Sequence, residues 1–369
     1  MKVIINKKVM NENLKMAKKM INNKSTFKDL KGIKITAKND NLKLECANND
    51  KGFHAIEINL QCEIIKDGSC LIDFKTLENS VINCDGDFVE IELIEDTLFI
   101  NGSNFRSKNN ITNDGDFAYT IEKNDYKNLC TIGFAELKKM IKKVNPAISS
   151  DKTKPVLNCF YMEFLENYLA LTSIDGYRLA TDKVYCKNDS ENSYILPAKI
   201  LNILTSIKSK NDAEICTNDK YIKITIDNIN LYIEFLKGDF IAYKKLITKD
   251  CNTKITINDT KKLYNTLKGF KDICKQNRLN EIILNIKDDK MIIQDLNNTM
   301  HNEIPIDTKD GENITICFNL IYLLDGLKNI CNDSVLTFKN NVNPLIIQNV
   351  NFTYLLLPIR VQNINEKVA

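Results

Sequence analysis

The same succession of helices and hairpins occurs three times along the chain, and this repetition restricts the possible folds more than any other feature. Each third starts with a short strand and an amphipathic helix, in which apolar residues such as Leu137, Ile141 and Val144 recur at helical spacing. A β-hairpin follows each helix. The first helices are expected at Val9–Asn22, Phe134–Asn145 and Asp259–Lys275, and these hairpins turn near Asp40, Glu166 and Asp289.

A second helix and a second hairpin complete each third. The second helices are expected at Phe74–Asn83, Pro197–Ile207 and Asn319–Ile330, and the second hairpins turn near Asp96, Asp219 and Asn341. Equivalent turns lie 122 to 126 residues apart, which matches one third of the 369 residues. We therefore expect three equal domains at residues 1–124, 125–249 and 250–369, joined at polar stretches that suit linkers.

The strands alternate between apolar and polar residues, as around Ile222, Ile224 and Ile226. Such alternation indicates sheets with one buried and one exposed face. Two helices against antiparallel sheet, repeated in each third, predict the α+β class. Apolar residues make up 43% of the chain, which is enough to bury a core and argues against disorder.

Positive charge is concentrated in the first helix of each third. Residues 7–24, 132–144 and 258–275 carry net charges of +5, +3 and +3, whereas the whole chain carries only +3 at pH 7. The rest of the chain is therefore acidic. A solvated lysine face would explain one such helix. Three equivalent basic helices instead favour a surface that attracts the phosphates of a polyanion without reading its bases.

The lysines of the second basic helix share one face. Lys138 and Lys142 lie four residues apart, as do Lys139 and Lys143, on the side opposite the apolar stripe. If the three first helices pack on the same side, they form a concave basic wall that suits a passive lining for duplex DNA. Lysine contacts to phosphate require no fixed register, so such a protein would move along the helix axis.

The twelve cysteines do not suggest a metal site or disulfides. The closest two are eight residues apart, and only His54 and His301 offer imidazole ligands. Zinc usually takes ligands from closely spaced pairs, so we expect buried hydrophobic cysteines and no metal or other cofactor. The sequence starts without a long apolar stretch, and its apolar runs are shorter than the ~20 residues of a membrane span. These features predict a cytoplasmic protein.

Four stretches of the sequence carry family-specific motifs. The residues KPVLN at 154–158 and LTSIDGYRLA at 171–180 form a central pair. The other two are GDFIAYKKL at 238–246 and YLLLPIR at 354–360. Together they resemble the bacterial DNA polymerase III beta subunit family, the sliding clamps, in its central signature, its glycine-x-Phe-Pro-Asp-Tyr segment and its terminal aromatic–aliphatic–Pro–aliphatic–Arg sequence. The resemblance spans the chain, includes the threefold order, and is weakest in the first third.

The resemblance implies a non-catalytic processivity factor for DNA replication. Clamps of this family are head-to-tail homodimers in which six equivalent domains close a ring, with helices inside and sheets outside. The ring encircles duplex DNA, slides without sequence specificity and tethers the polymerase, at an effective concentration of about mM for short flexible links. The implied partners are double-stranded DNA, a second copy, the DNA polymerase catalytic subunit, the clamp loader, and mismatch-repair or other repair proteins, but no membrane.

The family also implies a cleft between the second and third domains that binds short hydrophobic peptide motifs. An aliphatic trough takes apolar side chains, while Arg178 and Arg360 suit polar ends. Carried over by motif, its wall consists of Leu157, Ile174, Gly176, Tyr177, Arg178, Leu179, Ile241, Lys245, Leu246, Pro344, Leu355, Leu357, Pro358, Ile359 and Arg360. Without the resemblance, the segment 355–359 would be interpreted as a plain buried terminal strand.

This sequence departs from the family pattern at two places in the cleft. Ile241 stands where the family usually has proline, and Tyr177 stands where it usually has histidine. Both changes alter the shape of the cleft, so we expect a different peptide preference. Family clamps are also commonly acidic, whereas this chain carries +3. An accessory clamp copy with a narrower repair or mobile-element role therefore remains an alternative.

Contacts to DNA are expected from the basic helices, the residue after the first of them and the start of the central motif, and contacts between copies from the first and last thirds of the chain. The residues expected to contact DNA are Lys24, Lys139, Lys143, Lys154, Lys268 and Lys271. At the ring-closing dimer interface, a strand near Phe105 is expected to meet the region near Ile273.

Two rival functions use other features of the sequence. A nucleic-acid enzyme would bind metal through Asp85 and Asp87, or through Asp288 and Asp289. Both pairs lie at turns, where aspartate is expected for backbone reasons, and no His–carboxylate cluster, P-loop or nucleophile elbow accompanies them. We therefore expect no active site. The second rival is a monomeric DNA-binding scaffold that never closes into a ring.

Overall fold

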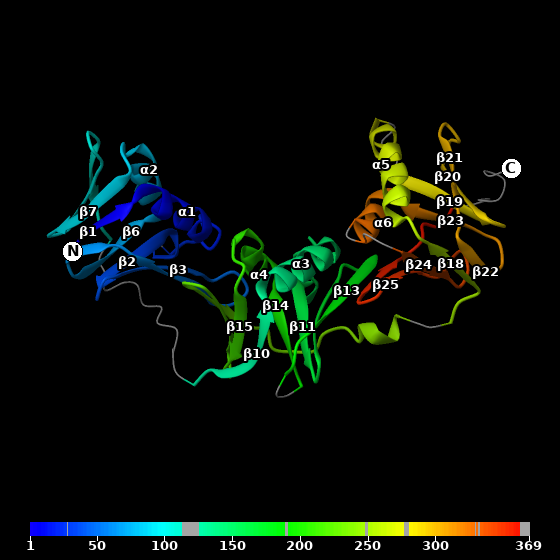
Figure 1. The fold of residues 1–369 in the computed structure, drawn as a ribbon, viewed down its shortest axis with the longest axis horizontal. Helices are drawn as coiled ribbons and strands as arrows, with labels where there is room; N and C mark the ends of the chain where they lie inside the picture. Colours follow the sequence, from blue (N-terminus) through cyan, green and yellow to red (C-terminus); the bar gives the residue numbers. More distant parts are fainter. Residues whose placement is uncertain are drawn as a thin grey trace. The chain divides into compact units, whose positions relative to one another are not determined.

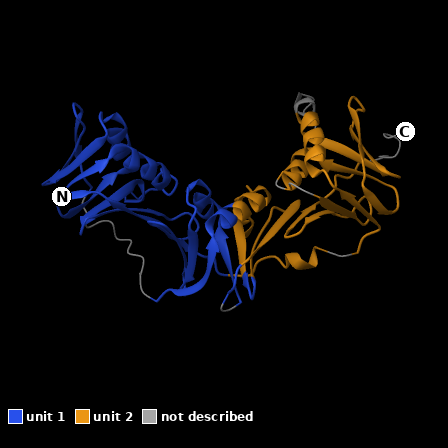
Figure 2. Ribbon diagram, viewed as in Figure 1, with its two compact units in different colours: residues 1–138, 164–167, 186–237 blue, residues 139–163, 168–185, 238–369 orange. Residues whose placement is uncertain are grey.

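The chain forms two compact units (Figure 2). Its computed structural model describes residues 1–27, 29–112, 125–188, 191–247, 250–276, 280–328, 330 and 333–361. Unit 1 comprises Met1–Lys138, Phe164–Asn167 and Cys186–Lys237; unit 2 comprises Lys139–Glu163, Tyr168–Tyr185 and Gly238–Ala369. The boundary between them divides the middle third, so the three domain ranges expected from the repeat remain a prediction.

Unit 1 is built on two antiparallel sheets with strand orders β5-β1-β7-β8-β9 and β10-β15-β16-β17-β4-β3-β2-β6. The first sheet contains β1 (Lys2–Asn6), β5 (Glu63–Lys66), β7 (Phe88–Ile94), β8 (Thr97–Asn101) and β9 (Arg106–Asn110). The second contains β2 (Gly32–Lys38), β3 (Asn41–Asn48), β4 (His54–Gln61), β6 (Gly68–Asp73), β10 (Lys127–Gly133), β15 (Asp212–Thr217), β16 (Tyr221–Ile226) and β17 (Ile229–Glu234). The unit also holds β14 (Asn192–Pro197).

Polar caps start the helices of unit 1 directly after strands. Asn6 accepts the backbone N–H groups of Lys8 and Val9 at 3.0 and 3.2 Å and so starts α1 (Lys7–Ala17). Asp73 accepts the N–H of Thr76 at 2.9 Å and starts α2 (Phe74–Asn83), as the sequence predicts. The predicted helix at 197–207 is α-helical only in α4 (Ala198–Leu201) and continues as a 3₁₀ helix at Asn202–Ser206.

Unit 2 is built on a larger and a smaller antiparallel sheet. In this unit the larger sheet runs β11-β12-β13-β26-β25-β24-β18-β22, and the smaller runs β21-β20-β19-β23. The larger sheet contains β11 (Cys159–Leu165), β12 (Tyr168–Ile174), β13 (Arg178–Tyr185), β18 (Thr253–Ile257), β22 (Thr308–Gly311), β24 (Ser334–Phe338), β25 (Leu345–Asn349) and β26 (Phe352–Leu356). The smaller contains β19 (Glu281–Lys287), β20 (Lys290–Asp295), β21 (His301–Pro305) and β23 (Ile314–Asn319).

Two helices of unit 2, α5 (Thr260–Gln276) and α6 (Leu320–Leu327), lie side by side (Figure 1). Asp259 accepts the N–H of Lys262 at 2.9 Å at the start of α5, and Asn319 caps α6 in the same manner. A Cβ on Gly326 would lie 2.5 Å from the Tyr354 ring, so the close approach of α6 to β26 requires glycine. Helix α3 (Phe134–Val144) continues from unit 1 into unit 2.

One strand pair in each unit joins strands from neighbouring thirds of the sequence. In unit 1, β17 pairs with β4, so that Ile229 lies opposite Ile58. In unit 2, β26 pairs with β13, so that Phe352 lies opposite Asp182. Both pairs are antiparallel, and both begin where a hairpin turn ends. These two pairs are called the first and second junction below.

The described cysteines are mostly buried, as expected for small hydrophobic residues: eight are buried, Cys62 is half-buried and Cys251 is exposed. Burial raises the pKa of the Cys216 thiol to about 11. Within the described ranges, no three histidine, cysteine or acidic side chains gather as metal ligands would. No helix in this part of the chain is long and apolar enough to span a membrane. The α+β class is confirmed.

Candidate functional site

The candidate cleft lies at the end of the second junction, where β13 begins and β26 ends. There Leu179 of β13 lies opposite Leu355 of β26. These two leucines form one buried cluster with Leu157, Ile174 and Tyr243. Four residues of the predicted wall are therefore brought together from separate parts of the sequence, and they form the apolar floor of the cleft.

Apolar side chains above this floor remain exposed. Tyr177 is 64% exposed, Leu246 44%, Ile241 41% and Leu357 39%. Gly176 has φ +95°, and no atom lies within 4 Å of the position of a Cβ there, so its conformation, not a lack of space, explains the glycine between β12 and β13. A buried apolar floor with exposed apolar side chains above it is typical of a docking surface.

Arg178 is already neutralised by neighbouring carboxylates. Its Nε lies 2.8 Å from Asp175 Oδ2 and its Nη1 lies 2.7 Å from Asp325 Oδ2, while the guanidinium lies 3.9 Å from the centre of the Tyr322 ring. These contacts tie β13 to α6. Arg178 therefore shapes the floor of the cleft, whereas Arg360 is exposed.

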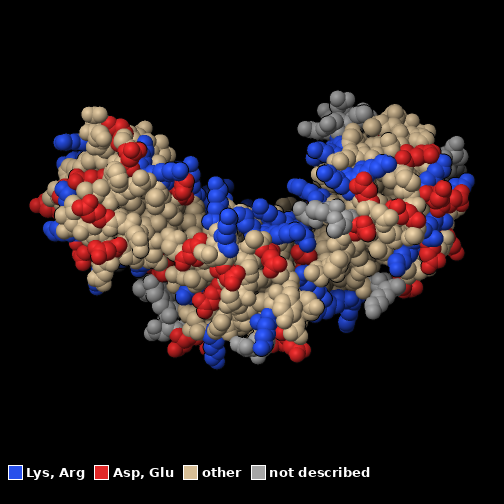
Figure 3. All heavy atoms as spheres, in the orientation of Figure 1, with Lys and Arg blue, Asp and Glu red and all other residues tan. Residues whose placement is uncertain are grey.

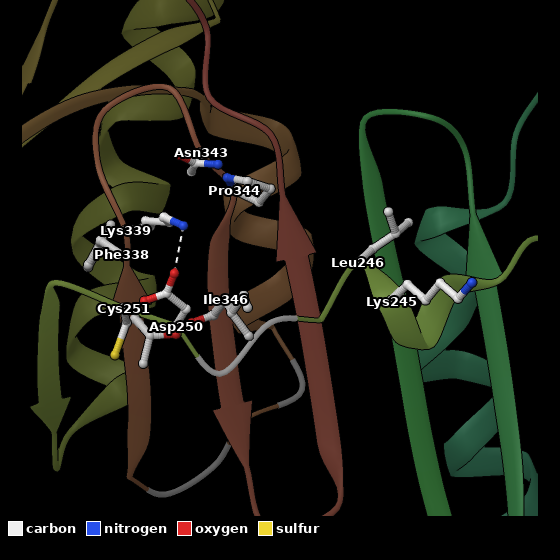
Figure 4. A pocket seen from close by; sticks show the side chains of 10 residues that line it. Lys245, Leu246, Asp250, Cys251, Phe338, Lys339, Asn343, Pro344 and Ile346 are labelled. Atoms are coloured by element: carbon white, nitrogen blue, oxygen red, sulfur yellow. Dashed lines mark hydrogen bonds and ion pairs between the residues drawn. The ribbon is translucent and has the colours of Figure 1, made fainter.

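A pocket of about 240 Å³ continues from the exposed side chains (Figure 4). Leu246 and Lys245 line it from one side, and Pro344 lies on the loop that joins β24 and β25. An ion pair on the same lining joins Lys339 Nζ to Asp250 Oδ2 at 2.6 Å, which sequence patterns did not indicate. The predicted residues Lys245, Leu246 and Pro344 thus line one pocket.

The last residues of the predicted wall, from Pro358 on, lie away from the floor of the cleft. The backbone N–H of Ile359 donates to Cys317 O at 2.8 Å, and its side chain packs against the buried pair Ile283 and Cys317 of the smaller sheet. Pro358 is half-buried between the two regions. Thus the chain leaves the floor of the cleft after Leu357 and reaches a second core cluster within two residues.

Most of the lysines expected to contact DNA are exposed. Figure 3 shows Lys and Arg side chains gathered over helix α3. The exposed predicted residues are Lys24, Lys139, Lys154, Lys268 and Lys271. Exposed ammonium groups on helices and adjoining loops are available to phosphates.

Two lysines of α3 make internal contacts. Lys143 Nζ lies 2.9 Å from Asp182 Oδ2, and these side chains are only 16% and 3% exposed. Lys143 also lies 5.5 Å from the centre of the Phe352 ring, so it supports the second junction. Lys138 donates to the carbonyl oxygen of Ile207 at 2.5 Å. The charge of Lys143 is thus already paired with Asp182. The assignment of Lys143 to DNA contact stays a prediction.

The acidic pairs considered as metal ligands serve local structure. Asp85 accepts backbone N–H groups from Asn104 and Phe105 at 2.8 to 3.0 Å. These hydrogen bonds lower the pKa of the Asp85 carboxyl to about 2. Asp288 has φ +53° in the turn between β19 and β20, a conformation that aspartate tolerates in hairpins.

Of the two residues predicted at the ring-closing interface, the structure describes the side chain of Phe105 only. Phe105 is half-buried and directly precedes β9, the last strand of its sheet. The side chain of Ile273 lies outside the described residues. The predicted strand near Phe105 is therefore present at a sheet edge, where it is able to pair with another strand.

Sequence reasoning missed a buried carboxylate beneath the cleft. Glu163 on β11 is 5% exposed and accepts hydrogen bonds from Tyr243 Oη at 2.5 Å and Lys244 Nζ at 2.7 Å. The available signal was a charged residue within the otherwise apolar run CFYMEFL. Burial raises the pKa of the Tyr243 phenol, and its hydrogen bond to Glu163 raises it further, so this group stays a donor.

Comparisons with known families match nearly the whole chain. Three models of the DNA polymerase III beta subunit match it in order: the N-terminal domain at residues 1–129, the central domain at 131–241 and the C-terminal domain at 244–360. A beta sliding clamp of Staphylococcus aureus (strain N315) is 30% identical over 234 residues, which make up 61% of this chain and 62% of that protein. A beta sliding clamp of Staphylococcus epidermidis is 26% identical over 363 residues, 93% of this chain and 94% of that protein.

Solved structures show the same fold. The DNA polymerase sliding clamp from Bacillus subtilis superposes with a TM-score of 0.91 at 22% identity, covering 98% of this chain and 99% of that one. The DNA polymerase III beta subunit from Thermotoga maritima gives a TM-score of 0.87 at 20% identity, covering 98% and 99%. At these identities the similarity establishes the arrangement of strands and helices.

Proposed function

This chain belongs to the DNA polymerase III beta subunit family, and we propose that it is a processivity factor that acts as a homodimeric ring around duplex DNA. In this role the protein is non-catalytic. It slides without sequence specificity and holds a polymerase at the primer end through its cleft. The observation that carries the proposal is that the two junctions repeat one register, while β9 and β21 each keep one edge without a partner strand among the described residues.

The two junctions are equivalent residue by residue. In the first, the N–H of Asn59 donates to Asn228 O at 2.9 Å, next to the pair Ile58 and Ile229. In the second, the N–H of Lys183 donates to Asn351 O at 3.2 Å, next to Asp182 and Phe352. In both, an asparagine ends the hairpin turn and the strand that follows it pairs with the neighbouring third.

The turn before strand β9 resembles the turns before β17 and β26. Asn104 ends the loop after β8, and the N–H of Gly102 donates to Phe105 O at 2.8 Å. Phe105 therefore corresponds to Ile229 and Phe352. On its other side β9 has no partner strand among the described residues. The free edge of β9 in the first third therefore corresponds to the edges by which β17 pairs with β4 and β26 pairs with β13.

Strand β21 is the counterpart of β4 and β13. It pairs with β20 so that Pro305 lies opposite Lys290 at the hairpin turn, as Tyr185 lies opposite Tyr168. Asn302 precedes Pro305 by three residues, and Asp182 precedes Tyr185 by three. Asn302 therefore corresponds to Asp182 and Ile58. By the repeated register, Phe105 of one copy faces Asn302 of a second copy.

The same register sets the charges at the closing contact. Arg106 faces His301 and lies diagonal to Glu303, within reach of a long side chain. The N–H of Glu303 corresponds to that of Asn59 and Lys183, and it donates to Asn104 O. Two such contacts join two chains head to tail, so six equivalent thirds close one ring.

Cysteine cross-linking tests this register. With the exposed Cys251 replaced by serine, Phe105→Cys and Asn302→Cys together are expected to form a disulfide between copies on mild oxidation, because opposed strand residues lie within disulfide range. Lys108→Cys with Asn302→Cys, three residues out of register, is the matched control. Equal cross-linking of both pairs, or a native mass that stays at the 42.3 kDa of one chain, would favour the monomeric scaffold.

Loading on DNA tests the function itself. With a bacterial clamp loader and ATP, the protein is expected to remain on nicked circular DNA through gel filtration and to fall off once the circle is cut. A ring held by linkage is lost at free ends, whereas direct phosphate binding keeps the protein on linear DNA. Retention on the linear form would contradict the proposal.

A further inference from the structure

The linker that forms one side of the cleft has little backbone support of its own. Between Gly238 and Ile247 its only regular element is a 3₁₀ turn at Tyr243–Lys245. Its backbone hydrogen bonds are local, such as those from the N–H of Lys245 to Ala242 O at 3.1 Å and of Leu246 to Tyr243 O at 2.9 Å. Even so, it presents Ile241, Lys245 and Leu246 to the cleft. Its conformation therefore depends on side-chain contacts.

The strongest of these contacts converge on one carboxylate. The two oxygens of Glu163 accept from two consecutive linker residues, Tyr243 at 2.5 Å and Lys244 at 2.7 Å. Glu163 and Tyr243 are 5% and 4% exposed, so the hydrogen bond between them is shielded from water. A buried carboxylate without these donors would be strongly unfavourable, which makes the contact specific for one linker position.

A second contact lies two residues earlier on the same strand face. Tyr161 stacks on Phe240 with 4.6 Å between ring centres and 3° between planes, and it meets the Tyr243 ring edge-on at 6.3 Å. Residues 161 and 163 of β11 point to the same side of the sheet. Strand β11 thus holds the linker on both sides of Ile241, at Phe240 and at Tyr243.

We propose that Glu163 is a positioning residue for peptide docking. It fixes the linker so that Ile241 and Leu246 form a preformed wall above the floor of Leu179 and Leu355. A preformed wall spares the peptide the cost of ordering the linker, so affinity depends on a residue that the peptide does not touch. This inference rests on the proposed function of the cleft and names what controls its affinity.

Peptide affinity and linker exchange test the inference together. The probe is a fluorescein-labelled hexapeptide with leucine and phenylalanine side chains and a free C-terminal carboxylate, titrated onto the full chain. We expect Tyr243→Phe to weaken binding about tenfold and Glu163→Ala to weaken it more, because each releases the linker. Glu163→Gln still accepts from Tyr243 and is expected to lose only about threefold. Glu166→Gln, an exposed residue in the turn after β11, is the matched control and leaves affinity unchanged.

A double-mutant cycle separates positioning from general destabilisation. Glu163→Ala combined with Tyr243→Phe is expected to bind no more weakly than Glu163→Ala alone, because both remove one contact. Amide exchange in residues 241–246 is expected to rise in these variants, while exchange in β12 stays unchanged.

Two results would decide against the inference in different ways. Wild-type binding with unchanged affinity in both Glu163→Ala and Tyr243→Phe overturns the positioning role and leaves the proposed function intact. Absence of peptide binding by the wild type, together with failure to load on nicked circles, overturns the proposed function and this inference with it.

Discussion

The first and second junctions share a backbone register but differ in the residues at the end where the cleft lies. His54 of β4 faces Ile233, and Arg178 of β13 faces Leu356, at corresponding positions. The residue before each is aromatic: Phe53 packs against the core at the first junction, whereas Tyr177 is 64% exposed at the second.

At the first junction, side chains of the chain itself pair at the corresponding end, beside a pocket of about 470 Å³ lined by Gly52, Lys220 and Glu234. His54 is fully buried; its Nδ1 accepts from the N–H of Glu234 at 3.2 Å. The Glu234 carboxylate in turn accepts from the N–H of Phe53 at 2.5 Å. Phe53 and Tyr126 pack over the cluster that contains Ala55 and Tyr232. The counterpart of Glu234 at the second junction is Leu357, which leaves an exposed apolar side chain in its place.

This difference shows that the same backbone pairing can carry different side chains at its end. The paired strands hold the thirds together in both places. The side chains beyond the last pair differ, because they are largely charged at the first junction and apolar and exposed at the second.

Removing Arg178 should give the largest difference between the junctions. Arg178→Ala leaves Asp175 and Asp325 without their shared cation and is expected to lower the free energy of unfolding by about 3–5 kcal/mol. Lys220→Ala at the first junction removes an exposed pair with Glu234 and is expected to cost less than about 1 kcal/mol. Urea unfolding of both variants measures this, and equal losses would contradict the comparison.

Substitution of Lys143 tests whether its charge stabilises the second junction or binds DNA. Lys143→Met leaves Asp182 buried and unpaired and is expected to cost about 3 kcal/mol. Burial raises the pKa of Asp182 and Lys143 opposes that rise, so the variant should regain stability as pH falls from 7 to 5 and the carboxyl takes up a proton. The exposed Lys139→Met should keep its stability and weaken salt-dependent DNA binding. The reverse pattern would assign Lys143 to DNA.

The first junction should be the more sensitive to acid. Burial lowers the pKa of His54 to about 4, below its ordinary value of 6.5. The unfolded chain therefore binds a proton at His54 before the folded chain does, and stability present above pH 6.5 is lost as pH falls towards 4. This linkage predicts a loss of about 2 kcal/mol at pH 5. Urea unfolding at pH 7, 6 and 5 should show this slope in the wild type, and a His54→Gln variant with the same slope would refute it.

Removing Phe53 from the first junction should cost less stability than the changes to Arg178 and Lys143. Phe53→Ala removes a half-buried ring and is expected to cost about 1–2 kcal/mol. The exposed gap should let a second, weaker peptide bind each chain, detectable by native mass spectrometry at excess peptide. Tyr177→Ala should lose the original peptide without a comparable loss of stability. One peptide per chain in Phe53→Ala would show that more than Phe53 closes this junction.

Sequence patterns predicted the helices and first hairpins well because these depend on local signals. Helix α2 begins after the Asp73 cap and ends at Asn83 as expected. Helix α1 ends at Ala17 instead of Asn22, because Lys18–Met20 form a turn. The strands of the junctions were not predicted as pairs. Strand β9, with sequence RSKNN, has no apolar alternation, and its place in the sheet comes from its hairpin pairing with β8.

Motif resemblance found the floor of the cleft but not what supports it. Leu157, Ile174, Leu179 and Leu355 gather as predicted. Ile359 belongs to the same terminal motif and packs against Ile283 instead, since the chain crosses to the smaller sheet. The pairing of Lys143 with Asp182 joins residues 39 positions apart on different elements, a relation that no local pattern specifies.

In the proposed ring, the edges of β9 and β21, which lack a second partner strand in the described part of the chain, have a consequence for how many copies assemble. Because the two edges differ, each added molecule offers the same free pair again, and the hydrogen bonds themselves carry no instruction to stop. Termination after the second molecule requires every third to turn the path by about 60°. A substitution that flattens this turn by a few degrees would convert a finite object into a helical polymer, so the angle between neighbouring thirds is under the same constraint as the edges.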